Sequence, residues 1–289
     1  MKARQACLLL SLPLLATSQS HQADKLAVLR RAFEGPLPGQ RLEAAKEVAR
    51  QGKKAIPMLR ETLRSGSVRA RRAAMDASIA MGKQAAPLQE DLRHSLEDKV
   101  AWLRAGAAEA LGRLGPLSEK TIRALVPHAA DPDLFVRISV MQSLSKRGIT
   151  PHTELLLQAA VLCLEVKESG WAAKRFAVEL LRRKGRRYRA AIPALLRVFR
   201  ESPEGMWDQG ATIAQLLIDL GEKQQVLEIL ATRIEDPEKG GYKNSLRIIA
   251  GLGKLAHSLR PRLQTLLHEA KRGHVRKALE QTLQKLSGK

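Results

Sequence analysis

The sequence predicts an all-α fold, a right-handed α-solenoid of about seven and a half helical hairpin repeats. The first observation is a glycine that returns every 30 to 37 residues, which marks one supersecondary unit copied along the chain. The second is helical spacing of apolar residues before each glycine. The third is composition, because aromatic residues make up only 3% and no β-branched run alternates as a strand would. The glycines are Gly52, Gly82, Gly115, Gly148, Gly185, Gly221 and Gly253, and Ser287 takes the last place.

The segment before each glycine is predicted to be the second helix of a hairpin. Small or apolar residues stand eight and four positions ahead of the glycine, as Ala107 and Leu111 do ahead of Gly115. Four residues make about one turn, so both positions lie on one helix face. The glycine itself predicts a left-handed C-cap, a conformation that costs a residue with a Cβ about 1 kcal/mol.

The segment after each glycine is predicted to be the first helix of the next hairpin. Pro57, Pro87 and Pro193 stand where a first helical turn would tolerate a missing N–H group. Residues Asp24 to Phe33 are expected to form an N-terminal capping helix, and Val275 to Leu286 a terminal half-repeat. Neither helix of a hairpin is amphipathic enough to be stable alone, so neighbouring hairpins must pack together.

Two polar columns follow the same period. A base stands eleven residues before most of the glycines, although Gly210 and Tyr242 replace it in two units. An acid stands seventeen residues before many of them, near a helix start that it can cap. The base can reach the acid of its own unit or of the next. The predicted ladder comprises Asp98, Arg104, Asp131, Arg137, Glu168 and Lys174.

The segments Asp131-Pro-Asp-Leu-Phe-Val-Arg137 and Leu103-Arg-Ala-Gly-Ala-Ala-Glu-Ala-Leu-Gly-Arg-Leu-Gly115 resemble HEAT repeats. They are most similar to the short bacterial type that phycobilin lyases also contain, and the resemblance covers roughly residues 24 to 289. It implies that the acid–arginine columns form a structural ladder between repeats. It implies no chemistry, because a fold does not confer an activity.

The first residues of the chain resemble a secretory signal. Lys2 and Arg4 precede the apolar run Ala6 to Ala16, which is too short to span a bilayer comfortably. We expect a signal peptide at 1–20, a single HEAT-like repeat domain at 21–289, and an exported protein, periplasmic or secreted. After signal cleavage no membrane span is expected, and Cys163 would be the one cysteine left, as a small core residue.

The formal net charge is +21, which favours acidic partners at low salt. On the predicted second helices, bases that have an acid four residues away are partly neutralised. Four bases without such a neighbour are the candidate partner contacts. They are Arg50, Lys146, Arg182 and Lys285.

Trp102, Trp171 and Trp207 each lie near the start of a second helix, where they could anchor a partner or fill the seam between units. No catalytic, cofactor or metal site is predicted, because the histidines lack metal-ligand spacing and no nucleophile or phosphate-binding motif occurs. The predicted function is a non-enzymatic protein–protein scaffold that binds its partner on the concave face. The alternative is a binder of a polyanion, such as nucleic acid or an anionic envelope polymer, and a lyase-type enzyme or accessory comes third. The oligomeric state is left open.

Overall fold

The computed structural model describes residues 24–146, 152–167, 170–184, 188–201, 207–237 and 241–287. These residues form α-helices joined by short turns and 3-10 helices, and no strand occurs among them, so the all-α prediction is confirmed. Contacts divide the chain into unit 1 (Met1–Arg147) and unit 2 (Gly148–Lys289), each of which is described by itself below. The predicted single repeat domain at 21–289 stays a prediction, and the predicted signal at 1–20 lies outside the described residues.

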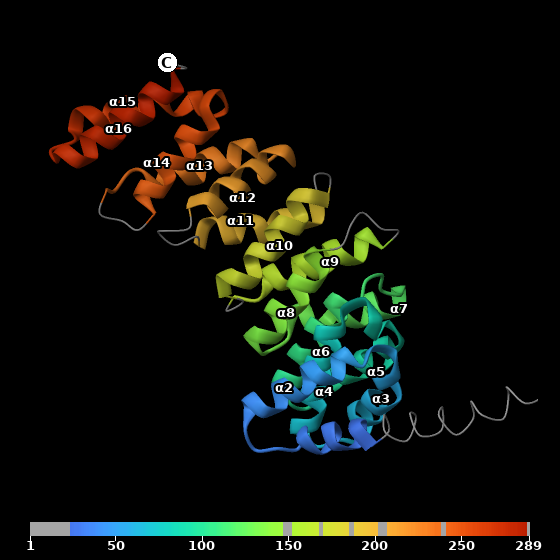
Figure 1. The fold of residues 1–289 in the computed structure, drawn as a ribbon. Helices are drawn as coiled ribbons and strands as arrows, with labels where there is room; N and C mark the ends of the chain where they lie inside the picture. Colours follow the sequence, from blue (N-terminus) through green and yellow to red (C-terminus); the bar gives the residue numbers. More distant parts are fainter. Residues whose placement is uncertain are drawn as a thin grey trace, which may run out of the picture. The chain divides into compact units, whose positions relative to one another are not determined.

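Unit 1 begins with a helix over residues 24–32, where the capping helix was expected. Pairs of helices then follow one another along the chain (Figure 1). The elements are α2 (Pro38–Arg50), η1 (Gly52–Ala55), α3 (Ile56–Ser65), α4 (Val68–Met81), η2 (Gly82–Leu88), α5 (Gln89–His94), η3 (Ser95–Glu97), α6 (Ala101–Arg113), α7 (Glu119–Leu125), η4 (Pro127–Ala130) and α8 (Leu134–Ser145).

Unit 2 continues the alternation and ends in a helix that includes the predicted terminal half-repeat (Figure 1). The elements are α9 (Thr153–Glu165), α10 (Gly170–Lys184), η5 (Arg189–Ala191), α11 (Ile192–Glu201), α12 (Trp207–Asp219), α13 (Lys223–Arg233), α14 (Tyr242–Leu252), η6 (Gly253–Leu259), α15 (Arg260–Glu269) and α16 (Gly273–Leu286).

The even-numbered helices are the predicted second helices, and within each unit they pack side by side. In unit 1 the second helices contact one another more extensively than the first helices do. The predicted columns explain this, because Ala74, Ala107 and Leu111 are fully buried and small side chains let the helices approach closely. The predicted columns are buried along both units except at Leu283, which is half-buried. Each hairpin therefore completes its core against the next.

Close packing between α6 and α8 depends on a glycine inside a helix. A Cβ on Gly112 would lie 2.3 Å from Ser143 Oγ, far inside van der Waals contact. The Ser143 hydroxyl instead crosses to α6 and donates to the Ala108 carbonyl at 2.8 Å. The glycine thus lets a buried hydroxyl find a backbone acceptor on the neighbouring helix.

Among the described recurring glycines, all five have a positive φ, as the sequence predicts. The predicted left-handed C-cap is wrong at two of them, however. Gly82 has φ 55° with ψ −126°, and Gly253 has φ 52° with ψ −123°, which is the mirror image of extended backbone. In this conformation each glycine ends one helix and begins the 3-10 helix that leads into the next. A residue with a Cβ strongly disfavours that region.

Two of the three predicted prolines lie in the first turn of an α-helix, and the third does not. Pro57 and Pro193 are the second residues of α3 and α11, as predicted. Pro87 lies instead in η2, two residues before α5 begins. The chain there follows a longer 3-10 path after the glycine, and a proline costs no helical hydrogen bond at that place.

We expect Gly253→Ala to lower the free energy of unfolding by about 1–3 kcal/mol, because alanine is strained at φ 52°. Gly251→Ala is the matched control, since a Cβ at either glycine meets no atom within 4 Å and Gly251 lies inside α14. That variant should keep or slightly raise stability. Urea unfolding followed by circular dichroism measures both, and equal effects would contradict the role given to backbone conformation.

Candidate partner-binding surface

The acid–arginine ladder is present in unit 1 and links one second helix to the loop ahead of the next. Arg71 Nη1 lies 3.1 Å from Asp98 Oδ2. Arg104 contacts Asp131 through two bonds, from Nε to Oδ2 and from Nη2 to Oδ1, each 2.8 Å long. In both pairs the base reaches the acid of the following repeat, 27 residues later. The base thus contacts the next repeat, one of the two arrangements that the sequence left open.

Arg104 and Arg137 also donate to their own repeat. Arg104 Nη1 donates to the carbonyls of Asp98 and Lys99, and Arg137 Nη1 donates to those of Asp131 and Pro132. The Arg104 guanidinium thereby binds the turn before its own helix and also the acid of the next repeat. Arginine suits this geometry, because its planar fork carries five donors that can reach carbonyls and a carboxylate together.

The Asp131 carboxylate has two further hydrogen-bond partners. Its Oδ1 accepts the N–H of Asp133 at 2.9 Å, and its Oδ2 lies 3.2 Å from His128 Nδ1. Burial acts to raise the pKa of Asp131, but the hydrogen bonds from Arg104, Asp133 and His128 and the charge of Arg104 together hold it below its ordinary value. The acid is therefore ionised and structural, with no capacity left for a substrate.

In unit 2, Lys174 takes the ladder position of the base. Lys174 Nζ donates to the Lys167 carbonyl at 3.2 Å and lies 5.3 Å from the centre of the Trp171 ring. Its predicted neighbour Glu168 lies outside the described residues. Burial lowers the pKa of Lys174, opposed by the charge of Glu201. Lys174 thus serves the turn before its helix, as the arginines do in unit 1.

A second arginine column, missed in the sequence, ties the first helices together. Arg64 Nε donates to Asp91 Oδ1 at 2.6 Å, and Arg197 Nη2 donates to the Leu164 carbonyl at the end of α9 at 2.7 Å. Arg233 Nη2 donates to the carbonyls of Phe199 and Arg200 at the end of α11. These carbonyls have no partner within their own helix, so the arginines act as caps. The period could have revealed the column, because all three arginines stand twelve residues after a recurring glycine.

Two of the four predicted contact bases are not free of acids. Arg50 Nη1 lies 2.6 Å from Glu47 Oε2, and Arg182 Nε lies 2.7 Å from Glu179 Oε2. No acid stands four residues from either base, as the sequence indicates. Both of these pairs are three residues apart, a spacing that a helix also brings together, so these two bases are partly neutralised as well. The pKa of Glu47 and of Glu179 is lowered to about 2, chiefly by side-chain hydrogen bonds, from Lys25 and Arg50 and from Arg182 and Arg183 respectively.

Lys146 and Lys285 are exposed at the ends of α8 and α16, and neither forms an ion pair within the described ranges. Of the four predicted partner contacts, Arg50 and Lys146 belong to unit 1, and Arg182 and Lys285 belong to unit 2. Their role in binding stays a prediction.

An apolar row that the sequence reasoning did not recognise is exposed in unit 1. Each of the four consecutive second helices carries a large apolar side chain at its N-terminal end, and Trp102 and Phe135 are 44% and 71% exposed. Arg72 Nη1 on α4 donates to the Trp102 carbonyl on α6, so neighbouring members are held side by side. Helices pack 8–10 Å apart, which makes the row roughly 20–30 Å long. We call this the apolar row; it comprises Leu37, Val68, Trp102, Leu134 and Phe135.

The tryptophans share a place in the repeat but not an environment. Trp102 is exposed, so it does not fill the seam between repeats. Trp171 is half-buried against Lys174. Trp207 is the first residue of α12, and its side chain lies outside what the structure describes. Hydropathy at a helix start could have indicated the row, but only tertiary packing distinguishes exposed members from buried ones.

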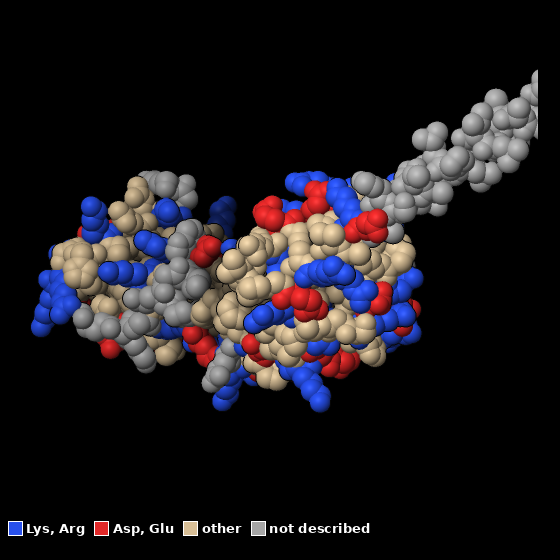
Figure 2. All heavy atoms as spheres, turned by 60° about the horizontal axis from the view of Figure 1, so that its bottom comes forward, with Lys and Arg blue, Asp and Glu red and all other residues tan. Residues whose placement is uncertain are grey.

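Charge is distributed unevenly over the molecule. In Figure 2 acidic residues lie among the basic ones on unit 1, to the right of the view. Many unit 1 bases are engaged by these acids, as Arg60 and Arg64 are by the buried Asp91. From Lys243 to Lys289 the sequence instead has 11 Lys or Arg and only 2 Asp or Glu. The C-terminal end of unit 2 therefore carries an excess of positive charge.

The described part of the chain lacks the clustered ligands of a metal site. No group of three or more His, Cys, Asp or Glu that could hold a metal ion occurs among its residues. Cys163 is fully buried in α9, which fits the small core residue that the sequence predicts. No described helix is long and apolar enough to cross a membrane. The predictions of no enzyme activity and no cofactor stay predictions.

Comparison with known proteins gives distant likenesses only. No protein-family model and no curated protein matches the chain, whereas 71 chains of solved structures do. An engineered protein is 16% identical, with a TM-score of 0.48, over 90% of this chain and 78% of its own. The CpcE–CpcF complex of phycocyanin lyase from Nostoc sp. PCC7120 is 20% identical, with a TM-score of 0.41, over 80% of this chain and 94% of its own. Similarity this distant does not indicate what this chain binds.

We expect Arg104→Met to lower the free energy of unfolding by about 3 kcal/mol, because the buried Asp131 carboxylate would lose its bidentate partner. Adding Asp131→Asn should cost less than the single effects summed, as contacting residues do in a double-mutant cycle. Arg113→Met is the control: its exposed pair with Glu109 spans 4.0 Å and should contribute under about 0.5 kcal/mol. Urea unfolding measures all four, and an Arg104→Met effect as small as the control's would contradict the ladder's role.

The lowered pKa of Asp131 also predicts how stability depends on pH. The contribution of Asp131 to the free energy of unfolding should be fully present well above pH 3.8, the ordinary pKa of the carboxyl group. It should be lost as the pH falls through the lower pKa of the folded state. Asp131→Asn has no carboxyl to protonate there and should show a shallower loss of stability between roughly pH 5 and 2. Thermal unfolding across that range measures the difference, and parallel curves for the variant and the wild type would refute the assignment.

Proposed function

We propose that this protein is a non-enzymatic interaction scaffold whose unit 1 binds an acidic protein partner along the apolar row. The observation that carries the proposal is the exposure of Trp102 and Phe135 beside Leu37, Val68 and Leu134 on consecutive helices. Large apolar side chains are costly to leave in water as a contiguous patch, and aromatic residues dominate the energetics of protein interfaces.

The charges beside the row support an acidic partner. Arg69 follows Val68 and Lys99 precedes Trp102, and both are exposed without an ion pair among the described residues. Carboxylates on a partner would meet these bases at the rim, where charges steer association more than they add affinity. The helical repeat supports such a role, because stacked hairpins present an extended surface.

Further observations support export and the HEAT-like type of repeat. The positive start and short apolar run of residues 1–20 support export to the periplasm or beyond. The acid–arginine ladder in unit 1 supports the HEAT-like type of repeat, and the closely packed second helices support their placement on the concave face. Nothing in the described site supports a lyase-type reaction.

A polyanion binder is the second candidate, and the charge of unit 2 favours it. The 11 bases and 2 acids from Lys243 to Lys289 could draw nucleic acid or an anionic envelope polymer to that end of the chain. In unit 1, by contrast, many bases are already paired with acids. The two candidates therefore place the partner on different units.

We expect the double variant Trp102→Ser, Phe135→Ser to weaken partner capture by about 30-fold or more, since a buried aromatic anchor contributes about 2 kcal/mol or more. The full chain serves as bait in an envelope fraction of the source cell at low and high salt. Leu255→Ser, which alters an exposed apolar residue of unit 2, is the control and should retain the partner.

Retention of the same protein by the wild type and the control at both salt concentrations, with its loss from the row variant, supports the proposal. Capture unaffected by the row variant contradicts it. Capture that persists in the row variant and falls steeply with salt favours the polyanion reading, because counterion release drives such binding.

A further inference from the structure

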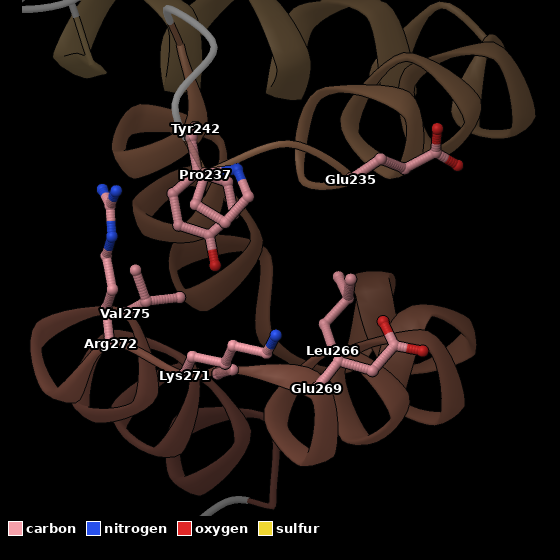
Figure 3. Close-up of a pocket in the computed structure, with 9 residues that line it drawn as sticks. Glu235, Pro237, Tyr242, Leu266, Glu269, Lys271, Arg272 and Val275 are labelled. Carbon is pink, nitrogen blue, oxygen red and sulfur yellow. The ribbon is translucent and has the colours of Figure 1, made fainter.

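A cavity of about 260 Å³ lies in unit 2 between the start of α14 and the pair α15–α16 (Figure 3). Apolar side chains form much of its wall, and polar groups reach in from two sides. Tyr242 points its hydroxyl into the space from one side, and Lys271 extends its amine toward it from the other (Figure 3). The apolar wall comprises Pro237, Leu266, Ala270 and Val275.

The cavity lies where the ladder is interrupted. Counted from the recurring position, Tyr242 takes the place of the base Arg104, eleven residues before Gly253. Ala270 takes the place of the acid Asp131, seventeen residues before Ser287. In unit 1 an internal carboxylate occupies this place, whereas Ala270 supplies none. The space is thus a carboxylate site of the repeat from which the carboxylate is missing.

The Tyr242 hydroxyl needs a partner that the described residues do not supply. The residue is only 2% exposed, and its oxygen has no hydrogen-bond partner among them. A buried polar group without a partner costs about 1–3 kcal/mol. Burial also raises the pKa of Tyr242, so the hydroxyl stays protonated and can donate.

The charges around the cavity favour an anion. Glu235 lies in the wall but is paired with Arg262, its Oε1 lying 2.7 Å from Nη2. Glu269 is the remaining acid, and Lys271 and Arg272 are the bases. With Arg262 counted, three bases stand against two acids, in a basic stretch of the chain.

We propose that this cavity binds a carboxylate on a short apolar stem, with the Tyr242 hydroxyl and the Lys271 amine as its donors. The ligand's carboxylate takes the place that Asp131 holds in unit 1, and its stem packs on Leu266 and Val275. A volume of about 260 Å³ is small for a ligand pocket, which suits a stem of a few carbons. The inference goes beyond the proposed function, because the site lies in unit 2 and does not involve the apolar row.

Calorimetric titration of the full chain at low salt tests the site. The probes are butyrate, a free small carboxylate, and acetyl-glutamate amide, which presents an acidic side chain in peptide form; butyramide is the neutral analogue. We expect at least one carboxylate to bind and butyramide not to bind. The tighter of the two identifies the source of the ligand. Binding of neither carboxylate, or equal binding of butyramide, overturns the proposal.

Three variants assign the binding to the cavity. Tyr242→Phe keeps the ring and removes the donor, and it should weaken binding about tenfold or more, as expected for a hydrogen bond to a charged group. Ala270→Asp supplies the missing carboxylate and should abolish binding while it raises the melting temperature. Lys271→Met, at an exposed position, should weaken binding without loss of fold. Wild-type affinity in folded Lys271→Met and Ala270→Asp overturns the proposal, whatever the row variants do to partner capture.

Discussion

The structure depends on one constraint: a helical hairpin here can bury its apolar faces only against the next hairpin. Small residues on the second helices, such as Ala74 and Ala107, let neighbouring helices approach closely, and Gly112 lets α6 meet Ser143 of α8. Burial of apolar surface alone would not fix how neighbouring helices are aligned, because one alanine-lined face resembles another. The buried contact between Arg104 and Asp131 is directional, and it fixes the register in which α6 meets the loop before α8.

The same contacts divide the surface into satisfied and available regions. A guanidinium that binds two carbonyls and a carboxylate, as that of Arg104 does, has four of its five N–H donors engaged, so the basic composition of unit 1 overstates its free charge. What remains at the helix starts is apolar: the row that includes Trp102 and Phe135. In unit 2 the columns degenerate, and Tyr242 and Ala270 leave a cavity where unit 1 has an ion pair. A repeat can therefore acquire a binding site by losing an internal contact.

Much of the architecture could be read from the period of the chain. The glycines located the hairpins, the positions eight and four residues ahead of them located the buried faces, and the ladder spacing located the pair of Arg104 and Asp131. These succeed because they are local or repeat at a fixed interval, so a column of letters becomes a column in space. The conformation of Gly82 and Gly253 was missed because φ and ψ there follow from the 3-10 helix that begins at the glycine.

The candidate sites were harder to predict because exposure and pairing are properties of assembled helices. Arg50 and Arg182 have no acid four residues away in the sequence, yet each forms an ion pair with an acid three residues away. Trp102 could equally have filled a seam, and only packing of α4 against α6 leaves it in water. The sequence by itself determined a helical repeat, its period and the ladder positions of Arg104 and Asp131, since each follows from spacing. The tertiary structure decided which side chains face solvent and which polar groups lack a partner, because burial is fixed only when neighbouring hairpins meet.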